Sequence, residues 1–271
     1  MAVPVTHDPL ALTGTGSSPR SIAVGPNGEF YTANFGANDI TAFDVTGSNL
    51  FLQQLGPLKA PTAIARDSSG ALWTANSADH SISKYIPGHT TPSTIGLTIT
   101  SRPTAITIDA SHVSDPSDVV YTADSADNVV AKSTEAAGII TTNARWALLA
   151  PNTAPKGIVT DSLGNVYTAN SLNSTVSKIT PAGVVTDRFT EFSPGDGPDA
   201  ITIDSHGMLY VANYSAGTVV KIDSTQPALA NVVASYTLPT NAEPMGIAVD
   251  AHDNVYVSES GPNTVALIPA G

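Results

Sequence analysis

A sixteen-residue pattern recurs along this chain and constrains its fold more than any other feature. The clearest two copies are residues 61–76, PTAIARDSSGALWTAN, and residues 155–170, PKGIVTDSLGNVYTAN. The six copies begin at Pro19, Pro61, Pro103, Pro155, Pro198 and Pro244, with spacings of 42, 42, 52, 43 and 46 residues. A period of about 40–45 residues is typical of four short strands that form one blade of a β-propeller. The sequence therefore predicts an all-β, six-bladed β-propeller, with residues 1–271 as one domain.

Each copy carries the signals of three antiparallel strands and a more variable fourth. An alternating apolar segment follows the proline and leads into a turn such as Asp161-Ser-Leu-Gly164. In this turn Asp can accept backbone N–H bonds and Gly can adopt a positive φ, so the chain doubles back. The second strand contains an aromatic residue, which we expect to pack between blades, and ends in Asn, Asp or Glu. We assign the fourth strands to residues 50–55, 94–99, 139–149, 184–189 and 232–238.

The sixth copy stops after its third strand, whereas an alternating segment at residues 5–12 precedes the first copy. One blade thus has no fourth strand, and one predicted strand has no blade. We expect the N-terminal segment to complete the last blade, so that the ring closes and no sheet edge between the first and last blades stays unpaired.

Composition excludes several classes of function. The chain has 23 acidic and 11 basic residues, a net charge of −12, which would repel a nucleic-acid backbone. It has no cysteine, so it contains neither disulfides nor a thiolate site, and no apolar run approaches the roughly 20 residues of a membrane span. Many Thr, Ser, Asn and Ala residues with little Lys favour an extracellular or periplasmic bacterial domain, and we expect a monomer.

The repeat resembles that of the NHL and streptogramin-lyase-like (virginiamycin B lyase) propeller superfamily. In the lyases a catalytic His follows the repeat proline, a Glu lies fourteen residues later, and a magnesium ion assists. The resemblance thus implies a role for position 259, where this chain has Glu259. The six positions after the proline, however, contain no histidine, and Met245 stands where the partner of Glu259 would be. Methionine can neither transfer a proton nor bind magnesium, so the resemblance predicts the scaffold but not the chemistry.

Candidate ligand-binding residues lie at one end of each predicted blade. Because the first two strands are antiparallel, the residue after the proline and the last residue of the second strand should lie together near the propeller axis. We expect a polar axial mouth formed by Arg20, Asn34, Asn76, Asp124, Lys156, Asn170, Asp199, Asn213 and Glu259. Two alternatives stay open: the Asn residues could bond neighbouring backbone and hold blades together, and charges could cancel locally, Arg20 with Glu259 and Lys156 with Asp124 or Asp199.

No catalytic or metal-binding motif emerges elsewhere. No serine lies in a Gly-x-Ser-x-Gly elbow, no His pair has zinc-ligand spacing, and the Asp-x-x-Gly segments are better explained as turns than as calcium loops. We therefore expect a non-enzymatic module that uses its axial mouth to bind a small ligand or a protein, with no cofactor. The alternatives are a divergent lyase or hydrolase that uses Glu259, Asp124 or Asp199 around a divalent metal ion, and a purely structural scaffold.

Overall fold

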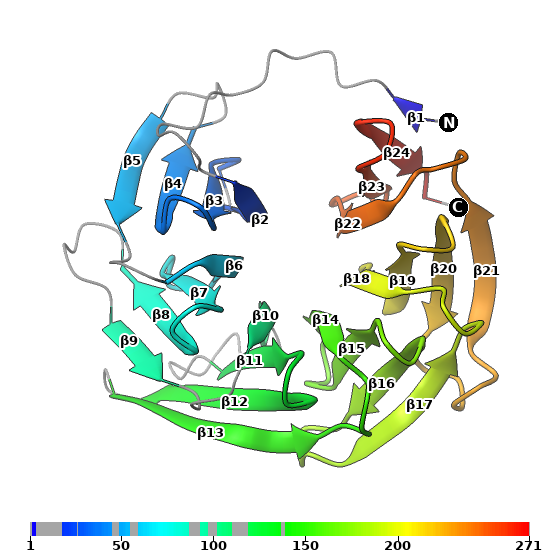
Figure 1. The fold of residues 1–271 in the computed structure, drawn as a ribbon, viewed down its shortest axis with the longest axis horizontal. Helices are drawn as coiled ribbons and strands as arrows, with labels where there is room; N and C mark the ends of the chain where they lie inside the picture. Colours follow the sequence, from blue (N-terminus) through cyan, green and yellow to red (C-terminus); the bar gives the residue numbers. More distant parts are fainter. Residues whose placement is uncertain are drawn as a thin grey trace. The chain divides into compact units, whose positions relative to one another are not determined.

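The computed structural model describes residues 2–3, 18–25, 27–44, 49–54, 59–86, 93–96, 102–109, 119–136 and 139–270. In these ranges the chain forms six four-stranded antiparallel sheets, as the repeat predicts (Figure 1). Two compact units contain three sheets each: one spans residues 8–146, and the other combines residues 147–271 with residues 1–7. No helix with the length and apolar character of a membrane span occurs in the part of the chain that the structure describes.

All six repeats have the same strand order. The first strands begin at the repeat proline and are β2 (Pro19–Val24), β6 (Pro61–Arg66), β10 (Pro103–Ile108), β14 (Pro155–Thr160), β18 (Pro198–Ile203) and β22 (Pro244–Val249). The second strands are β3 (Phe30–Asn34), β7 (Leu72–Asn76), β11 (Val119–Asp124), β15 (Val166–Asn170), β19 (Met208–Asn213) and β23 (Val255–Glu259). The third strands are β4 (Asp39–Phe43), β8 (Ser81–Tyr85), β12 (Val129–Ala136), β16 (Thr175–Ile179), β20 (Thr218–Asp223) and β24 (Thr264–Ile268). The fourth strands are β5 (Asn49–Gln54), β9 (Ser93–Gly96), β13 (Ile139–Leu148), β17 (Val185–Glu191) and β21 (Val232–Thr237).

The last sheet takes its fourth strand from the N-terminus. The strand β1 (Ala2–Val3) pairs antiparallel with β24, with Ala2 opposite Ala266 and Val3 opposite Val265. The completion of the last blade by the N-terminal segment is therefore confirmed. The paired residues differ from the predicted residues 5–12, which lie outside the described residues.

The Asp-x-x-Gly turns tie the first two strands to the aromatic residue of the second. In the turn after β14, Asp161 Oδ1 accepts the N–H groups of Leu163 (3.0 Å) and Asn165 (2.8 Å). Its Oδ2 accepts the Tyr167 hydroxyl, 3.0 Å away, and burial followed by the Asp161 charge raises the pKa of that phenol. Trp73 bonds Asp67 in the same way, at 2.9 Å from Nε1. One carboxylate thus fixes both the turn and the orientation of the core aromatic.

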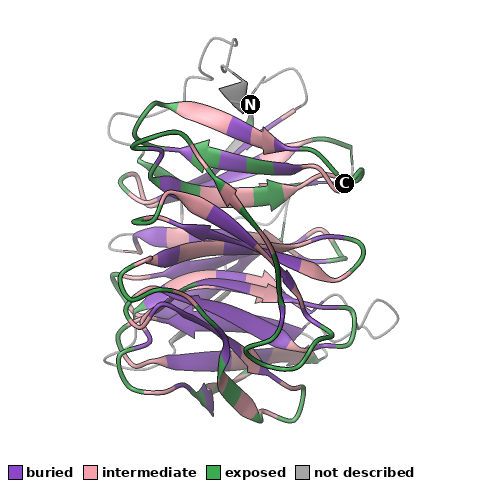
Figure 2. Ribbon diagram, turned by 90° about the vertical axis from the view of Figure 1, so that its right-hand side faces the viewer, coloured by how far each residue is buried: buried purple, intermediate pink, exposed green. Residues whose placement is uncertain are grey.

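That aromatic residue packs against the next sheet of the same unit, as expected. Tyr167 shares a core cluster with Ile201 of β18, and Trp73 shares one with Ile106 of β10. The second strands are almost fully buried except for β23, where buried and exposed positions alternate, whereas the fourth strand β21 has only exposed and partly buried positions. Figure 2 shows buried and exposed segments alternating along the ribbon. The side chain of Lys178 lies over the Tyr167 ring, and its Nζ donates to the Ser224 carbonyl of the neighbouring sheet (3.1 Å), which links two blades.

A β-bulge follows every repeat proline. In each first hairpin the proline is opposite the last residue of the second strand, and the register shifts before the second residue after the proline, as between Pro155 and Gly157. The post-proline residue is therefore left out of the ladder, and a bulge re-aims its side chain. The residue before the proline has a positive φ in five copies, including Ala154 (47°) and Glu243 (46°).

Candidate functional site

Four of the predicted mouth residues are asparagines that lie buried inside their own sheets. Asn76 Nδ2 donates to the hydroxyls of Ser81 (3.1 Å) and Ser83 (2.9 Å), which follow it by five and seven residues. Asn170 bonds Thr175 and Ser177 with the same spacing, Asn34 bonds Asp39 and Thr41, and Asn213 bonds Thr218. These amides hold the second and third strands of one sheet together, so their role is structural, but their partners are third-strand side chains and not the neighbouring backbone that the sequence led us to expect.

The two acidic residues at this position have other surroundings. Asp124 accepts the backbone N–H groups of Arg102, Ala126 and Asp127, between 2.8 and 2.9 Å away, which fully explains its burial. Glu259 is also buried, and its Oε2 accepts the hydroxyl of Thr264. Its second oxygen, Oε1, is buried with no hydrogen-bond partner among the described residues. Among the described residues, Asn34 Oδ1 and Asn213 Oδ1 are also buried without a partner, so Glu259 is the acidic member of a set of three such mouth residues.

In the unit formed by residues 8–146, the post-proline side chains make local contacts. The exposed Arg20 lies with its guanidinium 4.3 Å from the centre of the Phe35 ring. Thr62 donates to the carbonyl groups of Ala75 (3.1 Å) and Pro103 (2.8 Å), the second of which belongs to the neighbouring sheet. These contacts stabilise the hairpin ends, and Arg20 is the exposed charge among them.

In the other unit, the post-proline side chains belong to the first strands of three consecutive sheets, and two of them are charged. Lys156 of β14 forms an ion pair with Asp199 of β18, so one of the two pairings predicted for Lys156 is confirmed. The Lys156 side chain is 47% exposed and that of Asp199 is 15% exposed. Met245 of β22 is half exposed at the equivalent position, so an apolar side chain faces solvent there.

Two further residues extend this group, and the sequence did not predict them. The carboxylate of Glu243 raises the pKa of the Tyr214 phenol, with smaller contributions from burial and from Asp199. Ser260 Oγ donates to both the carbonyl (3.0 Å) and Oε2 (3.2 Å) of Glu243. Tyr214 follows the terminal Asn213, and Glu243 precedes the repeat proline, so both flank predicted positions. The sequence could have pointed to Tyr214 and Glu243, because each is adjacent to a residue that recurs in the repeat, Asn213 and Pro244.

We call the group formed by Lys156, Asp199, Tyr214, Glu243, Met245 and Glu259 the post-proline site. It carries three carboxylates and one ammonium group, and the ion pair between Lys156 and Asp199 cancels one charge of each sign. Glu243 then gives the site a negative balance beside the exposed methionine, whereas Glu259 is buried and accepts the Thr264 hydroxyl within its own sheet.

These sheets define a class of architecture, the six-bladed β-propeller. Comparison with solved structures finds virginiamycin B lyase from Staphylococcus aureus, with a TM-score of 0.79, 20% identity, and coverage of 96% of this chain and 86% of that chain. Hydrazine synthase from Kuenenia stuttgartiensis has a TM-score of 0.72 at 15% identity, covering 93% of this chain and 84% of that one. Regucalcin from Agrobacterium tumefaciens, a calcium-binding protein, has a TM-score of 0.62 at 14% identity, covering 92% and 89%.

No protein-family model matches the chain, and no curated protein is significantly similar to it in sequence. The resemblance to the streptogramin-lyase-like propellers is thus confirmed at the level of the fold. The three proteins above share one architecture, although their names describe different activities, so the function of this chain has to be inferred from its own side chains.

Proposed function

We propose that this chain is a non-enzymatic binding module whose ligand or protein partner is held at the post-proline site. The observation that carries the proposal is the group of re-aimed side chains on β14, β18 and β22. The bulge after each proline removes Lys156, Asp199 and Met245 from the ladder, so these residues are free to vary without loss of strand pairing. Bulges of this kind occur often beside functional sites.

The chemistry of the site favours a partner with a cationic group next to an apolar group. The negative balance left by Glu243 attracts an ammonium or guanidinium group, and the half-exposed Met245 offers a flexible apolar contact. Small-molecule sites commonly combine apolar surface with a few convergent polar groups in this way. A basic peptide or an organic amine fits this description better than a sugar or an organic acid.

Isothermal calorimetry and thermal unfolding with matched amines, acids, basic peptides and sugars test the proposal. We expect the cationic members to raise the unfolding midpoint, because a ligand that binds only the folded state stabilises it. The substitution Glu243→Gln should weaken binding about tenfold, the equivalent of about 1.4 kcal/mol. Glu191→Gln, at an exposed position of β17, is the matched control and should leave the affinity unchanged.

Equal affinity in the Glu243→Gln variant would remove the post-proline site from consideration. Preferential binding of acids that Lys156→Glu abolishes would contradict the cationic class of ligand. If no compound and no peptide changes the unfolding midpoint, the scaffold alternative replaces the binding module.

A divergent metal-dependent lyase or hydrolase is the second candidate, and the unsatisfied Oε1 of buried Glu259 favours it. This oxygen would suit a divalent cation, and Glu259 is the residue that would hold one. Magnesium demands six ligands in near-octahedral geometry, however, and Met245 supplies no oxygen, so the donor set fits a metal only in part. The same unfolding assay with Mg²⁺, with EDTA and with streptogramin lactones tests it. A Mg²⁺ shift that Glu259→Gln abolishes, together with lactone ring opening seen by mass spectrometry, would replace our first proposal.

A further inference from the structure

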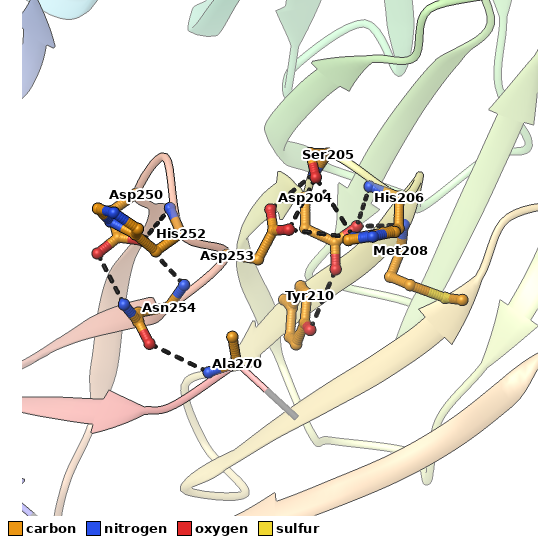
Figure 3. A network of polar contacts seen from close by, with 10 residues as sticks. All are labelled: Asp204, Ser205, His206, Met208, Tyr210, Asp250, His252, Asp253, Asn254 and Ala270. Carbon is orange, nitrogen blue, oxygen red and sulfur yellow. Dashed lines mark hydrogen bonds and ion pairs between the residues drawn. The ribbon is translucent and has the colours of Figure 1, made fainter.

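Two neighbouring turns in the unit formed by residues 147–271 bring together a group of polar side chains that the binding proposal does not use. The turn between β18 and β19 contributes Asp204, Ser205 and His206, and the turn between β22 and β23 contributes Asp253 (Figure 3). Ser205 donates to Asp253 twice, from its backbone N to Oδ1 (2.9 Å) and from its hydroxyl to Oδ2 (2.7 Å). His206 Nδ1 lies 3.0 Å from the same Oδ2.

Asp253 occupies an unusual backbone position for a residue with a side chain. It stands where the preceding turn has Gly207, and both residues have positive φ, 62° for Asp253 and 79° for Gly207. Glycine adopts this conformation without the steric cost that other residues incur. Hydrogen bonds from the Ser205 backbone and hydroxyl, and to a smaller extent the His206 ring, lower the pKa of Asp253.

Three atoms that could each be a ligand of a metal ion form a small triangle between these two turns. The sides are 3.0 Å from His206 Nδ1 to Asp253 Oδ2, 2.7 Å from Ser205 Oγ to Asp253 Oδ2, and 3.3 Å from Ser205 Oγ to His206 Nδ1. Nitrogen and oxygen ligands about 2.1 Å from a zinc ion lie roughly 3.0–3.4 Å from each other. Two sides of the triangle fall in this range, and the 2.7 Å side would lengthen by about 0.3 Å as the hydrogen bonds to Asp253 Oδ2 are exchanged for bonds to the ion.

The surroundings of the triangle suit a cation. The His206 side chain is 74% exposed, so water can fill the remaining coordination positions. Asp204 lies behind it, with a carboxylate oxygen within 4.8 Å of the ligand atoms of His206 and Asp253. Its Oδ1 accepts the N–H groups of His206 (2.9 Å) and Met208 (2.8 Å), and its Oδ2 accepts the Tyr210 hydroxyl (3.3 Å). Asp204 thus adds negative charge near the ion and orients the turn.

We propose that His206 Nδ1, Asp253 Oδ2 and Ser205 Oγ bind one divalent transition-metal ion of the Zn²⁺ type, which joins the turns of two adjacent blades. An imidazole ligand favours zinc, copper and nickel over magnesium or calcium, which prefer all-oxygen shells. The site is separate from Glu259, which lies at the opposite end of β23 from the turn that holds Asp253.

The repeat itself provides a control. His252 occupies the same position in its turn as His206, and its backbone N–H bonds Asp250 Oδ1 at 2.8 Å just as that of His206 bonds Asp204. Within the described residues His252 belongs to no group of three potential ligands. The substitution Asp253→Gly removes the carboxylate but restores the residue that other turns have at this position, so the variant should fold.

Calorimetry with Zn²⁺ on the untagged, EDTA-treated full chain, and the absorption spectrum of the Co²⁺ form, test the proposal. We expect one ion per chain, with an affinity that falls at least about tenfold in His206→Ala and in Asp253→Gly. The affinity of His252→Ala should equal that of the unmodified chain. Absence of saturable binding would overturn the proposal, as would an unchanged affinity in His206→Ala or an equal loss in His252→Ala.

Discussion

At the scale of single residues, the side chains of the third strand explain the bonds of the polar residue that ends the second strand in two of the blades, those of Asn76 and Asn170. Where the positions five and seven residues later carry hydroxyl groups, as Thr175 and Ser177 do, the terminal residue is an asparagine that donates to both. After Asp124 these positions hold Val129 and Ala131, which accept nothing, and the carboxylate instead caps backbone N–H groups. An Asn followed by Ser or Thr five and seven residues later therefore indicates in the sequence that the Asn side chain has a structural role.

We expect Asn170→Ala to destabilise the protein by about 2–3 kcal/mol. The substitution removes the donor to Thr175 and Ser177, and it leaves the Thr168 hydroxyl without its bond to Asn170 Oδ1 (2.9 Å) in a fully buried place. An unsatisfied buried polar group costs about 1–3 kcal/mol. Urea unfolding monitored by fluorescence measures the loss. The exposed Asn143 of β13 is the control, because Asn143→Ala should change stability by less than about 0.5 kcal/mol.

At the scale of strands, the sequence predicted the positions of those strands that are marked by residues of their own. The first and second strands were placed correctly because a proline opens one and an aromatic residue marks the other. Fourth strands were displaced by one or two residues at some ends, since β17 spans Val185–Glu191 where residues 184–189 were expected. Residues 97–99 of the strand predicted over residues 94–99 lie outside the described residues. The bulge after each proline was not predicted, because it arises from the pairing of two strands. No residue type within the first strand specifies it.

The candidate site was predicted only for residues inside the repeated strands. The hairpin geometry placed Lys156 beside Asp199 from sequence alone, since both follow a repeat proline on adjacent blades. Glu243 and Tyr214 were missed because they lie just outside the repeated strands. The contact between His206 and Asp253 joins residues far apart in the chain, so only the packing of one turn against the next reveals it.

Deletion of residues 1–13 tests the strand that completes the last sheet. The deletion removes β1 and leaves the edge of β24 unpaired, next to the buried side chain of Ala266. We expect the thermal midpoint to fall by about 3 °C or more, as a loss of more than about 1 kcal/mol does in a protein of this size. Removal of residues 270–271 is the control, because it breaks one exposed bond, from the Ala270 N–H to Asn254 Oδ1 (3.1 Å). A midpoint within a degree of that of the full chain would contradict the closure by β1.

At the scale of the whole molecule, charge determines how stability changes with pH. The net charge of −12 produces self-repulsion at neutral pH, and this repulsion decreases as carboxylates gain protons. Opposing this trend, several turn carboxylates are stabilised in the ionised form. Hydrogen bonds from the Asn254 side chain, and then from the backbone N–H groups of Asn254 and His252, lower the pKa of Asp250 to about 2. Hydrogen bonds from Thr225 likewise lower the pKa of Asp223.

These opposing effects predict a maximum of stability in mildly acidic solution. A carboxylate whose folded pKa is lowered contributes stability that is fully present above its unfolded pKa, about 3.9 for Asp, and is lost as the pH falls through the folded value. We therefore expect the urea midpoint to rise slightly from pH 8 to about pH 5, and to fall between about pH 4 and pH 2. Asp250→Asn should lower stability at pH 7 and make the decline below pH 4 shallower, because the variant has no proton to gain at this turn. The exposed Glu191, paired with Arg188 on the surface of β17, is the control. Glu191→Gln should leave the fall of the urea midpoint below pH 4 unchanged. If stability falls equally steeply below pH 4 in Asp250→Asn and in the unmodified chain, the turn carboxylates do not govern acid unfolding. General repulsion among the 11 Lys and Arg and the 6 His residues, all positively charged in acid, would then govern it.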